Sequence, residues 1–455
     1  MPKTSSRNLL GTLRRNKLAF FMLLLAFASG TFFFFYRHGG LLKGSSRSSI
    51  EGYDDCCYYF WLRSVMVDHD VDFSNEVLSY NSWDQSLRDN VMQRRRTPLG
   101  LVVDKYPIGW ALSGVPWFMM ADLVAGTLNL TGKHVPLDGW GPVYQAAVMF
   151  GQAIYTCLGL WFAYGILARF FPARYAVPGI LLAWLASPQF IYQTVHLSMS
   201  HGVMFFAVTG AWYFCLRLSD QPELRRYWMI TGCFCAFTIL VRNQGALLLI
   251  YPAALWLRLV IKTPRLLGHA ALGGGCFLLT ISLQLIAWKL LYGSFIVYTY
   301  TGEGFHWLHP HPWKILFSSN HGWFNWHPAM AIGSVGFFLW VGRQKSLVAW
   351  CFLVSYFAYL YINAAWDCWW FGASFGAREF EASTLFVMIG TAYLIQLAGS
   401  RRVLHASLVG IFLLLAVWNL NLTWITERCG GIPWGEPVTN TQKLQISMRY
   451  WSGRM

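Results

Sequence analysis

Long apolar runs separated by short groups of Lys and Arg fill most of this 455-residue chain. Hydrophobic residues make up 56% of it and charged residues only 12%, which is more apolar surface than a water-soluble chain of this length could bury. The sequence therefore predicts an all-α polytopic membrane protein. The net charge of +15 does not indicate nucleic acid, because basic groups placed between apolar runs follow the positive-inside rule.

The runs predict about eleven transmembrane helices, the first at 18–36 after a basic cytoplasmic tail at 1–17. Segment 108–128 is apolar but contains Pro116 and Asp122, and counting it as a crossing would place the basic groups of all later loops outside. It is therefore expected to be a broken or interfacial segment that dips into the membrane. The expected divisions are an extracytoplasmic acidic loop at 37–142 with juxtamembrane helices, a six-helix core at 143–292, a long outer loop at 293–325, four helices within 326–420 and an outer tail at 421–455.

The expected helices after the acidic loop follow the apolar runs closely. They are 143–169, 175–192, 202–218, 227–241, 244–262, 266–292, 326–341, 346–364, 380–398 and 403–420.

Acidic residues are concentrated in the first outer loop. Ten of the 20 Asp and Glu residues lie between Glu51 and Asp104, including the tandem pair Asp54 and Asp55. A carboxylate among aromatic residues at the membrane boundary is partly desolvated, which raises its basicity and suits a general base for an acceptor hydroxyl. The same pair also suits a helix N-terminus, because acids there interact favourably with the helix dipole. Both interpretations stay open on the residues alone.

Asp68, Asp70 and Asp72 alternate further along this loop. Such spacing occurs in cation sites, but the Gly and Glu that a calcium loop needs are not at the right positions. A solvated edge with a structural role is the favoured interpretation.

Four further polar residues fall at predicted outer ends of helices. Arg242 interrupts apolar sequence where the positive-inside rule disfavours a cation, and Arg378 has the same status, so each is a candidate partner for an anion. His196 and His201 flank one outer turn and could bind phosphate or orient an acceptor. The alternatives are interfacial polar residues for the histidines and a salt bridge to Glu379 or Glu381 for Arg378.

Several short motifs together resemble the GT-C superfamily of integral-membrane glycosyltransferases. The similarity is greatest to bacterial relatives of the protein O-mannosyltransferases and of the lipid A aminoarabinose transferases. The motifs are Tyr-Asp-Asp at 53–55, Tyr-Pro-Ile-Gly at 106–109, the segment 316–324 and the segment 369–378.

The resemblance implies an inverting transfer of a sugar from a polyprenyl-phosphate donor to an acceptor hydroxyl or amine on a glycan, lipid or protein. It implies an Asp general base in the first outer loop, expected to be Asp55 with Asp54 second. No cofactor is certain, and a divalent cation is left open. The active site would face outward from a bacterial inner membrane or the ER membrane. The expected substrate- and phosphate-binding residues are Arg242, Arg378, His196, His201, Lys105, Tyr58 and Tyr59.

A polytopic transporter or flippase of lipid-linked sugars is the alternative function. It would place ionisable residues at mid-helix near the bilayer centre. The middle of most predicted spans carries no charge, and the polar residues gather toward one face, which favours an enzyme.

Overall fold

The computed structural model describes residues 17–42, 50, 52–79, 85–93 and 96–454. Most of the predicted tail at 1–17 and the first acid of the loop, Glu51, lie outside these residues. The described part of the chain is mainly helical and forms no β-strand, apart from one isolated bridge between Phe305 and Trp366. The all-α prediction is confirmed.

Eight helical segments in the described part of the chain are long and apolar enough to cross a membrane, which agrees with a multi-pass membrane protein. Two further apolar helices are shorter, at Ala173–Leu185 and Thr384–Ala398. The eleven crossings predicted from the sequence remain a prediction. The long segments are Lys17–Tyr36 in α2, Gly109–Leu130 (α6), Pro142–Leu167 (α7), His201–Asp220 (α10), Asn243–Lys262 (η2 and α12), Pro264–Tyr292 (η3 and α13), Leu347–Ala365 (α17) and Arg402–Cys429 (α19).

Each of the ten apolar segments predicted after residue 142 is helical over most of its length, with three main differences in extent. The α-helix of segment 380–398 begins only at Thr384. Segment 175–192 is divided into α8 (Ala173–Leu185) and α9 (Gln189–Thr194), because Pro188 has no backbone N–H to continue the helix and disfavours helical backbone before it. The last segment does not end at 420 but continues to Cys429. The other helices are α2 (Lys17–Leu42), α3 (Tyr53–Arg63), η1 (Ser64–Asp68), α4 (Ser74–Ser79), α5 (Gln85–Gln93), α11 (Arg225–Val241), η2 (Asn243–Leu249), α12 (Ile250–Lys262), η3 (Pro264–Leu266), α13 (Leu267–Tyr292), α14 (Pro312–Phe317), α15 (Trp323–Trp326), α16 (Pro328–Gln344), η4 (Arg378–Phe380), α18 (Thr384–Ala398) and α20 (Asn440–Trp451).

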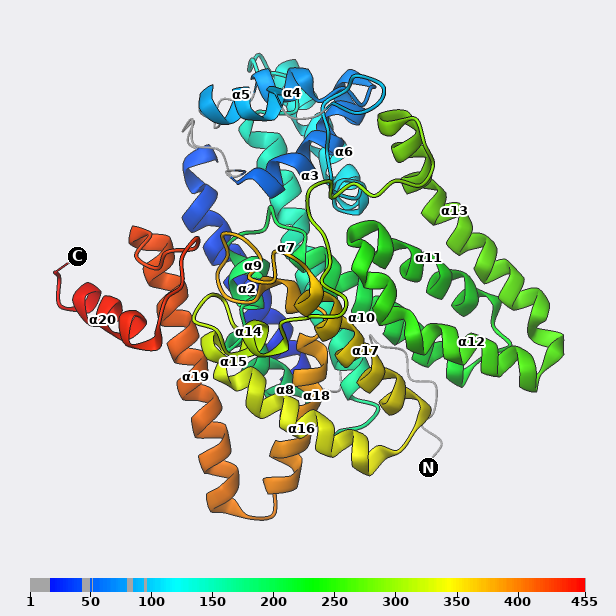
Figure 1. Ribbon diagram of the computed structural model, residues 1–455, viewed down its shortest axis with the longest axis vertical. Coiled ribbons are helices and arrows are strands. Elements are labelled where there is room, and N and C mark those ends of the chain that lie inside the picture. Colours follow the sequence, from blue (N-terminus) through cyan, green and yellow to red (C-terminus); the bar gives the residue numbers. More distant parts are fainter. Residues whose placement is uncertain (1–16, 43–49, 51, 80–84, 94–95, 455) are drawn as a thin grey trace.

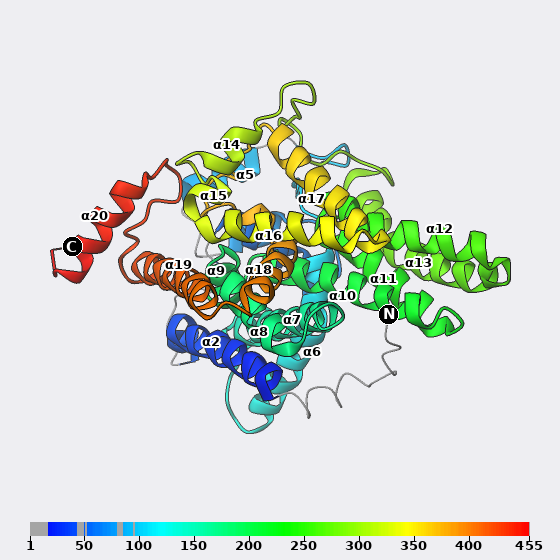
Figure 2. The same cartoon turned by 90° about the horizontal axis from the view of Figure 1, so that it is seen from below.

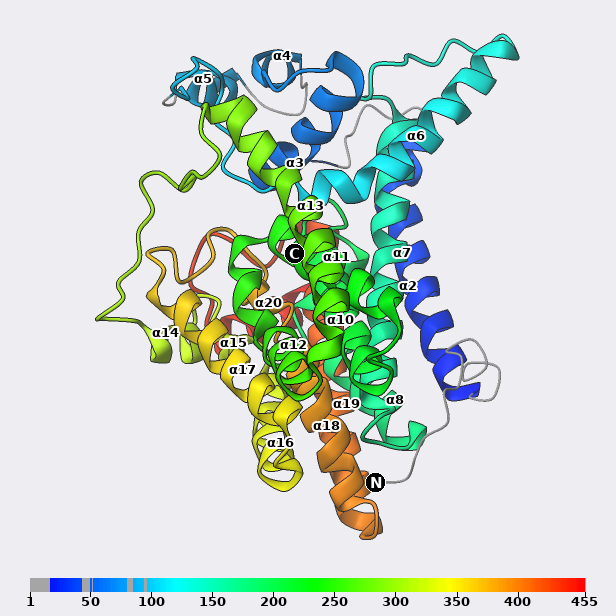
Figure 3. The same ribbon diagram turned by 90° about the vertical axis from the view of Figure 1, so that its right-hand side faces the viewer.

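Helix α6 corresponds to the segment predicted to dip into the membrane. It is one continuous helix of 22 residues with Pro116 inside it, so it is not broken. Figure 3 shows α6 running obliquely across the upper ends of α2 and α7, which themselves run side by side. Its assignment as a segment that does not cross stays a prediction.

The acidic segment and the basic turns lie at opposite ends of the molecule. In Figures 1 and 3, α3, α4 and α5 cap one end, and the turns from α16 to α17 and from α18 to α19 lie at the other. These turns carry Arg343, Lys345, Arg401 and Arg402. Figure 2 shows α12 and α13 projecting from one side and α20 from the opposite side.

Small residues let several helices approach backbone to backbone. Where α16 meets α18, a Cβ added to Gly390 would lie 1.9 Å from the carbonyl oxygen of Gly333. Where α11 meets α13, a Cβ on Gly232 would lie 2.2 Å from the carbonyl oxygen of Gly273. These contacts hold α16 close to α18 and α11 close to α13.

Candidate functional site

Helix α3 places the tandem acids at its first turn. The helix begins after Gly52, which makes no side-chain cap, so neither Asp54 nor Asp55 is the N-cap residue. Both carboxylates still lie where the N-terminal end of the helix dipole favours negative charge. Most of the following residues of α3 are buried, which fixes the helix against its neighbours.

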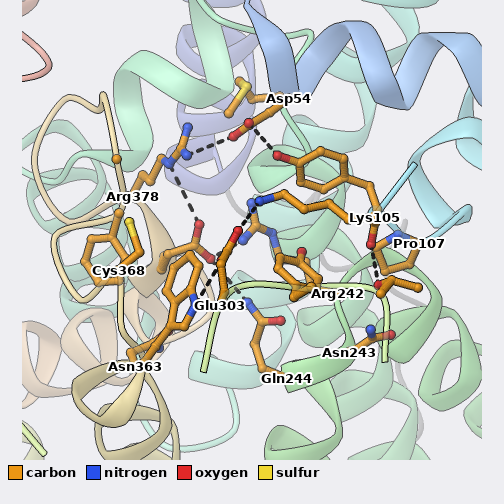
Figure 4. Close-up of a pocket in the computed structure, with 18 of the residues that line it drawn as sticks. Asp54, Lys105, Pro107, Arg242, Asn243, Gln244, Glu303, Asn363, Cys368 and Arg378 are labelled. Atoms are coloured by element: carbon orange, nitrogen blue, oxygen red, sulfur yellow. Dashed lines mark hydrogen bonds and ion pairs between the residues drawn. The ribbon is translucent and has the colours of Figure 1, made fainter. Parts of the chain in front are cut away.

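A cavity of about 820 Å³ opens beside the start of α3. Its walls come from parts of the chain that are far apart in sequence, and several of its polar side chains point toward one another (Figure 4). The lining segments are 52–58, 105–107, 241–247, 297–305 and 362–379, with His196, Met199 and Trp434.

Asp54 is held by two partners inside this cavity. The hydroxyl of Tyr106 donates to Oδ1 at 2.5 Å, and Nη2 of Arg378 donates to Oδ2 at 2.8 Å (Figure 4). Burial on its own would raise the pKa of Asp54, but the Arg378 charge and the Tyr106 hydrogen bond outweigh it and hold that pKa below its ordinary value. Asp54 is therefore ionised at neutral pH, and its side chain stays 23% exposed.

Asp55 also lines the cavity, but it is turned toward the neighbouring turn. Its Oδ2 accepts a hydrogen bond of 2.8 Å from the hydroxyl of Ser198, and only 5% of the residue is exposed. The two adjacent carboxylates therefore have different surroundings.

Two arginines and two glutamates continue the charged row away from Asp54. Nε of Arg378 lies 3.8 Å from Oε1 of Glu379, which confirms a salt bridge of Arg378 with a following glutamate. Arg242 pairs through Nη1 with Oε2 of Glu379, and its Nε lies 3.5 Å from Oε1 of Glu381. Arg242 ends α11 with extended backbone, which turns its side chain toward η4 and away from a further helical turn.

A third cation faces the same cavity from loop 97–107. Lys105 pairs with Glu303 and lies 4.9 Å above the centre of the Tyr300 ring. The other carboxylate oxygen of Glu303 accepts from Nε1 of Trp366 at 3.0 Å. This contact joins loop 97–107, the long outer loop and the end of α17.

The structure brings together most of the predicted site residues and excludes two. Tyr58 lines the cavity, and its hydroxyl accepts from Ser200 at 3.1 Å. Tyr59 points the other way, donating to the carbonyl of Gly139 at 2.5 Å, and is not among the residues that line the cavity. The adjacent positions of the two tyrosines on a helix turn them to different faces.

The two predicted histidines also differ. His196 lines the cavity and pairs through Nε2 with Glu427 at 2.7 Å. His201 does not line it; it is fully buried behind the charged row, with Nδ1 3.4 Å from Oε2 of Glu381.

Sequence reasoning missed Tyr106, Glu303, Glu379 and Glu381 as site residues. Glu303 was the easiest to find, because no other Asp or Glu lies between Glu223 and Asp367. Its isolation from other acidic residues is the sequence signal that could have identified it.

The alternating acids Asp68, Asp70 and Asp72, at and after the end of η1, have structural partners. Arg63 pairs with Asp68 and, at 2.8 Å, with Glu76. Asp70 accepts from the hydroxyl of Ser64 at 2.8 Å. Across the described residues, no group of three or more His, Cys, Asp or Glu side chains is placed to hold a metal ion. These contacts favour the structural interpretation of the alternating acids.

No protein-family model matches the chain, and no curated protein matches it. Among solved structures, it is similar to the crystal structure of ArnT from Cupriavidus metallidurans in the apo state, with a TM-score of 0.48 and 14% sequence identity. The similarity covers 95% of this chain and 75% of that one.

Proposed function

We propose that this protein is a membrane glycosyltransferase of the GT-C type, which moves a sugar from a polyprenyl-phosphate donor to an acceptor hydroxyl or amine. One observation carries the proposal: a cavity of about 820 Å³ holds an ionised carboxylate, Asp54, beside the cations Lys105, Arg242 and Arg378. Inverting transfer needs a base for the acceptor and positive charge for the leaving phosphate.

The cations suit the leaving group. When the bond between the anomeric carbon and the phosphate oxygen breaks, the bonding electrons remain on the phosphate as negative charge. Guanidinium groups bind phosphate oxygens with two parallel hydrogen bonds, and Lys105 adds a point charge. Because Arg378 is held between Asp54 and Glu379, its guanidinium group is already oriented at the cavity wall.

The contacts favour Asp54 as the base. Its carboxylate is ionised and faces the cavity, whereas Asp55 is nearly inaccessible and bound to Ser198. In the proposed step, Asp54 takes the acceptor proton while the acceptor oxygen or nitrogen attacks the anomeric carbon from the face opposite the phosphate. Asp55, favoured from the sequence, is the second candidate.

The remaining lining suits a lipid-linked sugar. Val241, Leu247, Val297 and Ile362 give part of the cavity an apolar wall that fits a prenyl chain. The basic turns at the opposite end support an extracytoplasmic cavity, because the positive-inside rule favours a cytoplasmic position for those turns. Nucleotide sugars are not expected there, so a donor carried by the membrane fits the location.

Transfer by purified protein in liposomes, supplied with a polyprenyl-phosphate sugar, tests the proposal. We expect Asp54→Asn to lower transfer by roughly 10²- to 10⁴-fold while donor binding is kept, because only the base is lost. Asp70→Asn is the matched control, since Asp70 is exposed and contacts Ser64 outside the cavity.

Full activity of both Asp54→Asn and Asp55→Asn would overturn an Asp base. Absence of donor binding in the wild type would overturn the proposal that the protein is a glycosyltransferase. Movement of a lipid-linked sugar between leaflets without transfer would instead support the flippase.

A further inference from the structure

Five charged side chains form a continuous row along one wall of the cavity and beneath it. Arg378 lies between Asp54 and Glu379, and Arg242 lies between Glu379 and Glu381. Three carboxylates thus share two guanidinium groups. If all three were ionised, the row would carry one more negative than positive charge, and Glu381, its fully buried member, would be charged away from water, which is unfavourable.

Glu381 is the member of the row with the weakest contacts. It is fully buried, and its side-chain partners are all distant: Arg242 Nε at 3.5 Å, the hydroxyl of Tyr359 at 3.5 Å and Nδ1 of His201 at 3.4 Å. Asp54, by contrast, has partners at 2.5 and 2.8 Å. Buried carboxylates that stay ionised are normally held by short, charge-assisted hydrogen bonds, which Glu381 lacks.

The groups around Glu381 come from four parts of the fold. His201 faces it from α10, Tyr359 from α17, Arg242 from the end of α11, and Glu379 from η4. Arg242 is the only cation among these described contacts, and it is already paired with Glu379.

We propose that Glu381 is a positioning residue that carries a proton at neutral pH and thereby leaves the charge of Arg242 available to an anionic substrate headgroup. The proposal rests on the proposed function for the identity of that headgroup, a phosphate. Burial raises the pKa of Glu381 to about 8, although Arg242 opposes the shift. A protonated Glu381 can donate to Nδ1 of His201, so Arg242 faces only one ionised partner.

Ionisation of Glu381 would place Arg242 between two carboxylates. The cavity is lined by three cations, Lys105, Arg242 and Arg378, and by four carboxylates, Asp54, Asp55, Glu303 and Glu379. A further negative charge directly beneath this lining would repel a phosphate. Loss of the Glu381 proton is therefore expected to weaken headgroup binding.

Infrared difference spectroscopy tests the proton without any substrate. At neutral pH the wild type should show the C=O stretch of a protonated carboxyl group that Glu381→Gln lacks, and this difference should disappear above about pH 8. Burial also raises the pKa of Glu76 to about 8, so Glu76→Gln, outside the cavity, is the control that removes a different carboxyl band. Identical spectra of wild type and Glu381→Gln would overturn the proposal.

Binding across pH tests the consequence. The probe is a prenyl phosphate methyl ester, which keeps one negative charge throughout the range. Wild-type and Glu76→Gln affinity should fall about tenfold per pH unit above the pKa of Glu381, whereas Glu381→Gln should bind as tightly as the wild type at pH 7 and show no such fall.

An equal alkaline fall in Glu381→Gln would overturn the role of Glu381, as would loss of its binding at pH 7 with unchanged thermal stability. If none of the proteins bound the probe at any pH, the proposed function would fail, while the infrared result would still decide the protonation of Glu381.

Discussion

Nη2 of Arg378 donates to Oδ2 of Asp54 at 2.8 Å, although 324 residues separate them in the chain. The contact joins the first turn of α3 to the loop before α18, and it lies in the wall of the cavity. It links the proposed base directly to the proposed phosphate-binding group. A change to Arg378 should therefore affect both donor binding and the chemistry at Asp54.

Arg378→Lys should keep the charge but lose the planar fork that reaches Asp54 and Glu379 together. We expect transfer to fall by roughly 10²- to 10³-fold, the usual effect of losing a preorganised electrostatic contact. Transfer rates and donor affinity in liposomes would check this. Arg174→Lys, at an exposed position at the start of α8, is the control and should behave as the wild type. Equal activity of the two variants would remove Arg378 from the site.

Tyr106→Phe should shift the acidic limb of the pH profile of transfer. The Tyr106 hydroxyl helps to keep the pKa of Asp54 below its ordinary value of 3.8, so its loss should raise that pKa. Activity is lost as pH falls through the pKa of the base, and in the variant this loss should begin at a higher pH. The measurement is kcat against pH. If the acidic limb lay at the same pH in the variant and the wild type, Asp54 would not be the group whose titration limits activity.

Gly390→Ala should destabilise the packing of α16 against α18. The added Cβ would lie 1.9 Å from the Gly333 carbonyl oxygen, so the helices must move apart, at a cost of about 1–3 kcal/mol or more. Thermal unfolding in detergent would show a lower midpoint. Gly410→Ala, in α19, has nothing within 4 Å of its added Cβ and should leave the midpoint unchanged or slightly raised. A normal midpoint for Gly390→Ala would contradict this close approach.

Lys443 should make stability rise with pH. It is fully buried in α20, 3.9 Å from the centre of the Trp326 ring, and burial lowers its pKa from 10.5 to about 7. Between these values the unfolded chain binds more protons than the folded one, so stability increases as pH rises from about 7 toward 10. Unfolding midpoints at several pH values would measure this slope.

Lys443→Met should flatten that slope, whereas Lys262→Met, at an exposed position, should keep it. An unchanged slope in Lys443→Met would assign the pH dependence to other groups.

The helices were predictable from sequence because the α-helix is the stable conformation of a long apolar run in a membrane. Within the hydrocarbon core no water is available, so a segment must form its backbone hydrogen bonds internally. The apolar runs therefore predicted the positions of α7, α10 and α13 closely. Single residues such as Pro188 then decided where a run divides. The course of α6 across its neighbours depends on packing, which the apolar run does not encode.

The site was predictable only in part, for a related reason. Asp54, Arg242 and Arg378 stood out as charges in apolar surroundings, and the cavity contains all three. Tyr58 and Tyr59 could not be separated, because α3 carries aromatic residues on all its faces and only packing shows which face is covered. Glu381 was placed only as a candidate salt-bridge partner of Arg378, whereas its contacts are with Arg242, His201 and Tyr359.

The wide separation of the cavity walls along the chain has a consequence for biosynthesis. A ribosome delivers Asp54 and the acidic loop early, but Arg378 and Trp434, which complete the cavity, emerge near the end. Until then the carboxylate lacks its counter-charge and can remain ionised only while water reaches it. The end of the molecule around Asp54 is therefore expected to stay hydrated until the last helices are made, and a chain that stops before Arg378 would carry Asp54 without this counter-charge.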